Sequence, residues 1–289
     1  MKIAAAALLL LAALTAGAED YAVHRDLPYA EPANPRQSLD VYSPLQGRNH
    51  PVILWIHGGG WTYGDKSDLQ QGSSDPVIRK PHAFAARGFV FVAINYRLFP
   101  QVGIGEMEAD VAKSVRWVHD HIRQYGGDPD SIVAMGHSAG AQLVALFCTD
   151  PSYLIQEGLS LHVLKGCVPV DGDMYYPPLQ LDTDINRRRV NSSRLKFPND
   201  GAEREYSSVF HVSSGKGIPP FLILCVADHP ETGTLIQSQV LASVLRISGV
   251  PEEMVACPGK VHETLNADLG LPGDKATEAV LAFLAKYAR

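Results

Sequence analysis

The sequence lacks several patterns that would assign it to a common class of binding protein. Its 25 basic residues are outnumbered by 31 acidic ones, and a net charge of −6 without a basic face argues against nucleic acid as a partner. It has four cysteines but no Cys-x-x-Cys, so neither a zinc ribbon nor a thioredoxin-type centre is indicated. After residue 18 no apolar run is long enough to cross a bilayer. The 46% of hydrophobic residues are ample for one large core.

The few cysteines all lie in apolar stretches, at Cys148, Cys167, Cys225 and Cys257. Free cysteine is common in buried segments of this kind, whereas an exported protein can also pair its cysteines. Cys225 and Cys257 fall on strands that we expect to be neighbours. A disulfide between these two residues therefore stays open.

The first residues are typical of an export signal. Lys2 precedes an apolar stretch from Ile3 to Leu14, and Ala16-Gly17-Ala18 fits a small-x-small cleavage site. We expect residues 1–18 to be a signal peptide, and residues 19–289 to be a periplasmic or secreted domain with no membrane span after cleavage. An uncleaved N-terminal anchor is the alternative.

Apolar runs alternate with helical patterns along the rest of the chain. Residues 52–56, 89–94 and 221–226 are continuously apolar, as expected of central strands covered on both faces. Residues 106–123 carry apolar side chains at spacings of three and four, which indicates an amphipathic helix. The alternation predicts one α/β domain with a mostly parallel central sheet and helices on both faces.

Two segments stand apart from this alternation. Residues 22–28 and 38–43 indicate two opening strands, which we expect to form an antiparallel edge. Residues 171–218 carry proline, asparagine and a basic run and have weak periodicity, so we interpret them as a small cap inserted over the site. The basic run Arg187-Arg188-Arg189 within the cap is interpreted as a solvated helix face.

The most informative stretch is Gly136-His137-Ser138-Ala139-Gly140. It follows the apolar run 132–135 and precedes an Ala- and Leu-rich run, so it predicts a strand, a tight turn and a helix with a serine at the turn. This is the Gly-x-Ser-x-Gly pattern that lifts a serine hydroxyl clear of a sheet and aims a helix N-terminus at the charge formed there. Ser138 is the predicted nucleophile.

A serine hydroxyl needs a base within hydrogen-bond reach, and in folds of this kind a histidine supplies it near the end of the chain. His262 follows the last expected strand, where such a sheet places its site. The other histidines after the serine are less suitable: His162 precedes a strand, His211 lies in the insertion and His229 lies beside the acid candidate. His262 is the predicted base.

The base in turn needs a carboxylate to orient it. Asp228 directly follows the penultimate strand and is the predicted acid. Asp171 and Asp173 follow the preceding strand, a position that some hydrolases use, and Glu231 is a further alternative. Asp228 could also cap the next helix, although Thr232 or Thr234 could do so instead.

The run Gly58-Gly59-Gly60 after an apolar strand predicts an oxyanion hole, because glycine allows the backbone to approach a substrate closely. The amides of Gly59, Gly60 and Ala139 are the expected donors. A phosphate loop is disfavoured because no Gly-Lys-Ser/Thr follows, and Asn266 stands where a His-Glu-x-x-His zinc motif starting at His262 would need its second histidine. No metal and no cofactor are expected.

These motifs resemble the α/β-hydrolase fold, and more narrowly its carboxylesterases with a His-Gly-Gly-Gly motif, the hormone-sensitive-lipase-like and feruloyl-esterase-like group. The resemblance covers nearly all of the chain after residue 18. It includes further motifs in order: Leu39-Asp40-Val41-Tyr42-Ser43-Pro44, Gly64-Asp65-Lys66, Asn95-Tyr96-Arg97-Leu98 and Gly126-Gly127-Asp128-Pro129. The chain departs from it at the acid loop, where Cys225-Val226-Ala227-Asp228 is one residue shorter than the His-Gly-x-x-Asp of many members.

The resemblance implies Ser138 as nucleophile, Asp228 as acid and His262 as base, with Gly59, Gly60 and Ala139 as oxyanion donors. The expected function is hydrolysis of small acyl or aryl carboxylic esters through an acyl-enzyme. One alternative is an amide or formamide hydrolase, similar to an arylformamidase, with the same triad. The other is a binding protein that keeps the fold without activity.

Overall fold

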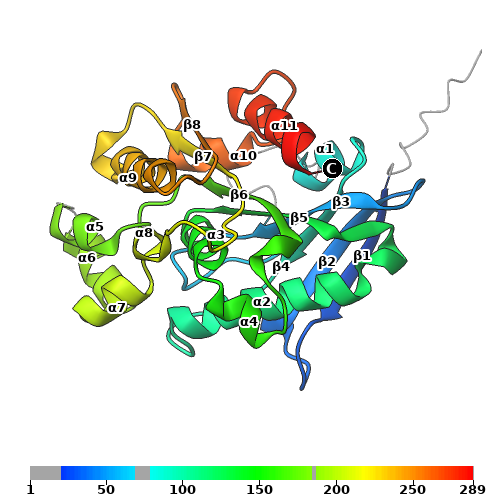
Figure 1. Ribbon diagram of the computed structural model, residues 1–289, viewed down its shortest axis with the longest axis horizontal. Coiled ribbons are helices and arrows are strands. Elements are labelled where there is room, and N and C mark those ends of the chain that lie inside the picture. Colours follow the sequence, from blue (N-terminus) through cyan, green and yellow to red (C-terminus); the bar gives the residue numbers. More distant parts are fainter. Residues whose placement is uncertain (1–20, 69–78, 184–186, 289) are drawn as a thin grey trace, which may run out of the picture.

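The computed structural model describes residues 21–68, 79–183 and 187–288, apart from the side chains of residues 183 and 187–190. The expected signal peptide, residues 1–18, and the side chains of the arginine run 187–189 lie outside the described residues. Eight strands form one twisted sheet, with helices on both of its faces (Figure 1).

The sheet has the order β1-β2-β4-β3-β5-β6-β7-β8. Its strands are β1 (Tyr21–Pro28), β2 (Ser38–Pro44), β3 (His50–Ile56), β4 (Val90–Ile94), β5 (Gly127–His137), β6 (Leu164–Val170), β7 (Phe221–Val226) and β8 (Glu252–Cys257). β2 is antiparallel to both β1 and β4, and all other neighbours are parallel. The mostly parallel sheet and its antiparallel edge are therefore confirmed.

Two layers of helices cover the sheet, as expected. The helices of the main body are α1 (Arg79–Ala85), α2 (Ile104–His121), α3 (Ala139–Thr149), α4 (Ser152–Gln156), α9 (Thr234–Ile247), α10 (His262–Ala267) and α11 (Lys275–Tyr287), with 3-10 turns η1 (Pro35–Gln37), η2 (Ile122–Tyr125), η3 (Leu161–Val163) and η4 (Pro230–Thr232). Buried residues of α2, α3 and α9 belong to one core cluster, and those of α1, α10 and α11 to the other. Figure 1 shows α2 and α3 on the opposite side of the sheet from α1 and α11.

The strands divide their side chains between the two cores because successive residues of a strand point to opposite faces. In β3, Val52, Leu54 and Ile56 pack with α2 and α3, whereas Ile53 and Trp55 pack with α1 and α11. A strand buried on both faces must be apolar throughout, which is why the run 52–56 indicated a central strand.

The parallel strands end at one edge of the sheet, and the loops that follow them carry the predicted site residues. The segment between β6 and β7 leaves the sheet, and its described residues form the short helices α5 (Pro177–Thr183), α6 (Arg187–Arg194), α7 (Asp200–Glu205) and α8 (Ser208–His211). It coincides with the segment 171–218 that the sequence set apart, and α8 packs on α3 and α9. The motif Gly126-Gly127-Asp128-Pro129 lies at the start of β5, where Gly127 pairs with His50.

All four cysteines are free and buried. Cys225 and Cys257 lie on adjacent parallel strands, as expected, but Val226 and not Cys225 is the partner of Cys257 in the register. An offset of one residue places the two thiols on opposite faces of the sheet. Within the described ranges, no helix combines the length and the apolarity that a transmembrane span requires.

Candidate active site

Ser138 lies at the turn between β5 and α3, in the strand–turn–helix that the sequence predicts. Its backbone has φ 57° and ψ −118°, a strained conformation for a residue other than glycine. The glycines two residues away are needed for packing: a Cβ at Gly136 would overlap the carbonyl of Gly140, and one at Gly140 would overlap the carbonyls of Ile56 and His57. Close packing of β3, β5 and α3 thus holds the serine in its strained turn.

His262 is the first residue of α10, just beyond β8. Its Nδ1 lies 2.7 Å from Oδ2 of Asp171, whose side chain is fully buried. The other carboxylate oxygen, Oδ1, accepts a hydrogen bond of 2.9 Å from the amide of Val226 at the end of β7. Nδ1 of the imidazole therefore donates to Asp171, and Nε2 is left as the nitrogen that can accept a proton.

The structure brings Asp171, and not the predicted acid Asp228, into contact with His262. Oδ2 of Asp228 accepts a hydrogen bond of 2.6 Å from the amide of Gly259, in the turn that leads to α10. Asp171, which the sequence left open as an alternative, stands directly after β6 with φ 54°. This left-handed backbone turns its carboxylate across the end of β7 toward His262. Glu231, the last alternative, contacts His229 instead.

Two opposing effects set the pKa of His262. Burial disfavours the imidazolium and lowers the pKa, whereas the hydrogen bond and the negative charge of Asp171 raise it. The charges of Asp173 and Glu263 act in the same direction as Asp171, and the pKa ends above its ordinary value. His262 is thus neutral at high pH, and it becomes protonated at a higher pH than a free histidine does.

His137, the residue before the serine, was not among the predicted site residues. Its ring lies 4.4 Å from the ring of His262 between centroids, and its Nε2 donates to the carbonyl of His262 at 3.0 Å. Burial, followed by the charges of His262 and Lys80, holds the pKa of His137 well below its ordinary value, so the ring stays neutral. This neutral donor fixes the main chain of the base. Its place inside the Gly-x-Ser-x-Gly motif was the only available signal.

The glycine loop after β3 lies beside the serine. A Cβ at Gly58 would come within 3.1 Å of the Cβ of Ser138, and one at Gly59 (φ 113°) would overlap the carbonyl of Tyr63. Gly60, with φ 56°, borders the cavity that contains Ser138. Only glycine fits such a path without strain, which explains the three-glycine run.

The side chain of His57 supports the glycine loop. Its ring stacks on Tyr96 with 4.4 Å between centroids, and the Tyr96 hydroxyl donates to the His57 carbonyl at 3.0 Å. Burial lowers the pKa of His57 to about 4, so its ring is neutral at pH 7. Nδ1 then donates to the carbonyl of Gly58 at 2.7 Å. The histidine of the His-Gly-Gly-Gly motif is therefore a support for the loop and not a candidate base.

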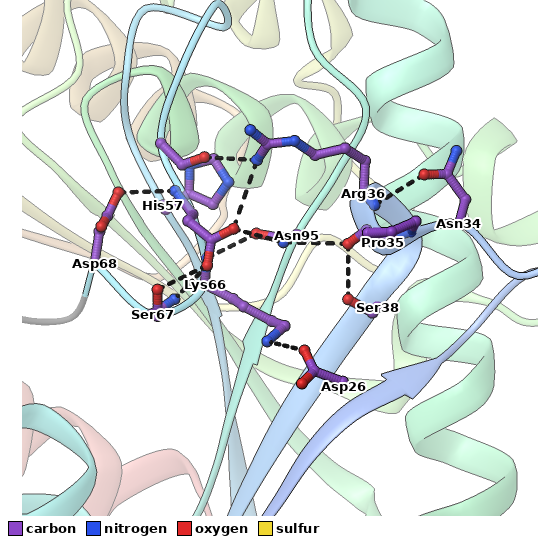
Figure 2. A network of polar contacts seen from close by, with 12 residues as sticks. Asp26, Asn34, Pro35, Arg36, Ser38, His57, Lys66, Ser67, Asp68 and Asn95 are labelled. Carbon is purple, nitrogen blue, oxygen red and sulfur yellow. Dashed lines mark hydrogen bonds and ion pairs between the residues drawn. The ribbon is translucent and has the colours of Figure 1, made fainter.

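A polar network ties the end of the glycine loop to the first strands (Figure 2). Arg36 donates to the carbonyl of Gly64 at 2.7 Å, and Asn95 bonds both the amide of Lys66 and the carboxylate of Asp65 at 2.7 and 2.9 Å. The ammonium of Lys66 is paired with Asp26 and Asp40 at 2.8 and 2.7 Å. The motifs Gly64-Asp65-Lys66 and Asn95-Tyr96-Arg97-Leu98 thus hold the loop in place before any substrate binds.

A cavity of about 400 Å³ opens over these groups. The structure brings together four of the predicted site residues on its wall, Ser138, Ala139, Gly60 and His262, whereas Gly59 and Asp228 do not border it. The remaining wall comes from the glycine loop, the loops after β6 and β7, α9 and the end of α6: Trp61, Tyr63, Asp173, Ser192, Ser193, Lys196, Thr232 and Thr234. Of these residues, Ser192, Ser193 and Lys196 belong to the segment 171–218.

Comparison with known sequences supports the motifs found above. Residues 39–157 match the BD-FAE family model. The probable isoprenylcysteine alpha-carbonyl methylesterase ICMEL1 of Oryza sativa subsp. japonica is 28% identical, over 91% of this chain and 62% of its own length. Esterase LipQ of Mycobacterium tuberculosis is 27% identical (90% and 61%), and the probable carboxylic ester hydrolase LipM of the same organism is 36% identical (71% and 48%). The chain therefore spans less than two thirds of each of these relatives.

Solved structures reproduce the arrangement of the sheet and its helices. Esterase B from Lactobacillus rhamnosis superposes with a TM-score of 0.73 at 23% identity, over 93% of this chain and 88% of that one. A Pyrobaculum calidifontis esterase superposes with a TM-score of 0.70 at 20% identity, over 91% and 84%. The expectation for the fold is thereby confirmed: the chain has the α/β-hydrolase fold, and its residues 39–157 are similar to the BD-FAE family.

Proposed function

We propose that this protein is a serine hydrolase of carboxylic esters, with Ser138 as nucleophile, His262 as base and Asp171 as the acid in place of Asp228. The observation that carries the proposal is the contact of 2.7 Å between His262 Nδ1 and the buried Asp171, beside a cavity that both Ser138 and His262 border. Relatives with names of ester hydrolases support the choice of bond.

The reaction follows from the placement of these groups. Oγ of Ser138 attacks the ester carbonyl while Nε2 of His262 takes its proton, and Asp171 stabilises the imidazolium that forms. The amides of Gly60 and Ala139 border the cavity beside Ser138 and are the donors proposed for the developing oxyanion, with Gly59 as a further candidate. Each such donor contributes about 2.7–4 kcal/mol in a comparable enzyme.

Collapse of the tetrahedral intermediate completes the first half of the reaction. The bond to the alcohol oxygen breaks as His262 returns its proton to that oxygen, and the acyl group stays on Ser138. A water molecule then gives a proton to His262 and attacks the acyl-enzyme. The bond between the acyl carbon and Oγ of Ser138 breaks as His262 returns that proton to Oγ, which releases the carboxylic acid and restores the serine. This sequence needs only groups of the chain and water.

Labelling of the nucleophile tests the proposal. An organophosphonate should attach stoichiometrically to Ser138, abolish hydrolysis of 4-nitrophenyl acetate and butyrate, and leave the Ser138→Ala variant unlabelled by mass spectrometry. Ser208→Ala is a suitable control, because this buried serine does not border the cavity and its hydroxyl donates to the carbonyl of Tyr175 in the cap. A wild-type protein that neither takes the label nor hydrolyses these esters would contradict the proposal and favour a binding protein. Faster turnover of an N-formyl aryl amine than of the matched aryl ester would favour the amide alternative.

We further propose that the protein is exported with loss of residues 1–18. The proposal is supported by the basic Lys2, the apolar stretch from Ile3 to Leu14 and the small residues Ala16 and Ala18. Expression of the full chain in a Gram-negative host, followed by N-terminal sequencing of the periplasmic fraction, should find Glu19 as the first residue. A cytosolic protein that retains Met1 would refute export.

A further inference from the structure

Lys196 is a buried cation on the wall of the catalytic cavity. It follows α6 in the middle of the cap, and only 7% of its surface is exposed. Its ammonium donates to the carbonyl and to the hydroxyl of Ser192, both at 3.0 Å, and lies 5.1 Å from the ring centre of Phe99. The next residue, Phe197, is fully buried and packs edge-on against Trp61 of the glycine loop. The ammonium is therefore fixed at the site and is not a free surface group.

Lys196 has no counter-charge among the described residues, in contrast to the other buried lysine near the glycine loop. Lys66 is equally buried but is paired with two carboxylates, Asp26 and Asp40. A buried ammonium is normally paired, because removing it from water is costly. The carbonyl of Ser192, near the C-terminal end of α6, and the ring of Phe99 offset part of this cost. Burial lowers the pKa of Lys196, as expected for a charge without a carboxylate partner.

We propose that Lys196 is a specificity-determining residue, which binds a carboxylate carried by the ester substrate. This inference rests on the proposed function. A single negative charge matches a single ammonium, and the hydroxyls of Ser192 and Ser193 on the same wall can donate to it. Among the described residues that border the cavity, Lys196 and His262 are the only basic ones.

The opposite charge in the cavity directs where the carboxylate binds. Asp173 also borders the cavity, and its charge acts on His262. It repels an anionic group on the side of the base. The ammonium of Lys196 lies instead 5.1 Å from the ring centre of Phe99, whose amide donates to the carbonyl of Trp61. A substrate with a carboxylate at one end is thus oriented with that end toward Lys196.

Two matched pairs of esters test the proposal. Mono-4-nitrophenyl glutarate and 4-nitrophenyl pentanoate differ in a charge on the acyl part, whereas 3-acetoxybenzoate and its methyl ester differ in a charge on the alcohol part. For at least one pair, Lys196→Met should lower the ratio of kcat/KM for the charged ester to that for the neutral ester by about 10- to 100-fold. Lys196→Arg should restore most of the lost ratio.

Lys216→Met is the matched control, because Lys216 also donates to a carbonyl near the end of a short helix, that of His211, but lies exposed outside the cavity. It makes the same change in net charge and should leave both ratios within about twofold. Ratios unchanged by Lys196→Met in both pairs would overturn the inference while leaving the proposed hydrolysis intact. If Lys196→Met does not fold, a wild-type preference above 100-fold for the neutral ester of both pairs overturns it equally. Absence of turnover of all four esters by the wild type would refute the proposed function itself.

Discussion

Replacement of Asp171 by asparagine is the sharpest test of the proposed triad. Asparagine has the same shape as aspartate, and its Oδ1 can keep the hydrogen bond of 2.9 Å from the amide of Val226. Its amide NH₂ then takes the position of Oδ2, 2.7 Å from Nδ1 of His262. Two donors cannot face each other, so the imidazole must move its proton to Nε2 and accept at Nδ1. In that tautomer His262 cannot take the proton of Ser138.

The expected loss of activity follows from these two changes. The wrong tautomer removes the base, and the loss of the carboxylate removes the charge that stabilises the imidazolium. The same substitution in a well-characterised serine protease lowers kcat about 10⁴-fold, which corresponds to about 5.5 kcal/mol of the barrier. We expect a fall in kcat of about 10³- to 10⁴-fold for Asp171→Asn. Stability should change by less than about 2 kcal/mol, because the hydrogen bond to the backbone is kept.

Asp228→Asn is the matched control, because this carboxylate also accepts one backbone hydrogen bond, from Gly259, but does not touch the base. Steady-state kinetics with 4-nitrophenyl butyrate should show a loss of less than about tenfold for Asp228→Asn. Circular dichroism and urea denaturation of both variants would establish that they are folded. The opposite result would refute the reasoning. In that result Asp228→Asn loses about 10³- to 10⁴-fold in kcat, and Asp171→Asn stays near the wild type.

Three further predictions concern the pH dependence, the core and the turn. The kcat/KM of the wild type should decline at acid pH with a pKa above the ordinary 6.5 of histidine, since protonated His262 is inactive. In Asp171→Asn this decline should move to lower pH, because the contact that raises the pKa of His262 is lost. Glu108 is fully buried without a partner for either oxygen among the described residues, and burial raises its pKa well above 4.5, so ionisation of Glu108 makes folding less favourable as the pH rises. Glu108→Met should therefore increase the free energy of unfolding by about 1–3 kcal/mol at pH 7, with a smaller gain below pH 4.5, as measured by urea denaturation. Gly136→Ala should destabilise the protein by about 1–3 kcal/mol and lower kcat, because its Cβ overlaps the carbonyl of Gly140; an unchanged urea midpoint would contradict this.

The fold could be predicted from the sequence because its signals are local. The run 52–56 is apolar at every position and must therefore lie between two layers. The Gly-x-Ser-x-Gly pattern at 136–140, between an apolar run and an Ala- and Leu-rich run, indicates a strand, a turn and a helix. The cap was harder. Helices α5 to α8 contain four to eight residues each, which is too short for a 3.6-residue period to emerge. Its border with the cavity depends on tertiary contacts such as that between Phe197 and Trp61.

The choice of the acid shows where local reasoning ends. β6 and β7 are parallel neighbours, so the loops after both strands reach the same edge and present carboxylates to the same histidine. The selection depends on backbone features that residue types do not reveal: the left-handed φ of 54° at Asp171, and the amide of Val226 directed at its carboxylate. The end of β7 thus holds the carboxylate of Asp171 through the amide of Val226, although Asp171 itself follows β6. Asp228 acts one step further away, because its bond to Gly259 fixes the turn before α10 and so the position of His262. Both carboxylates serve the base, but only one can compensate its positive charge.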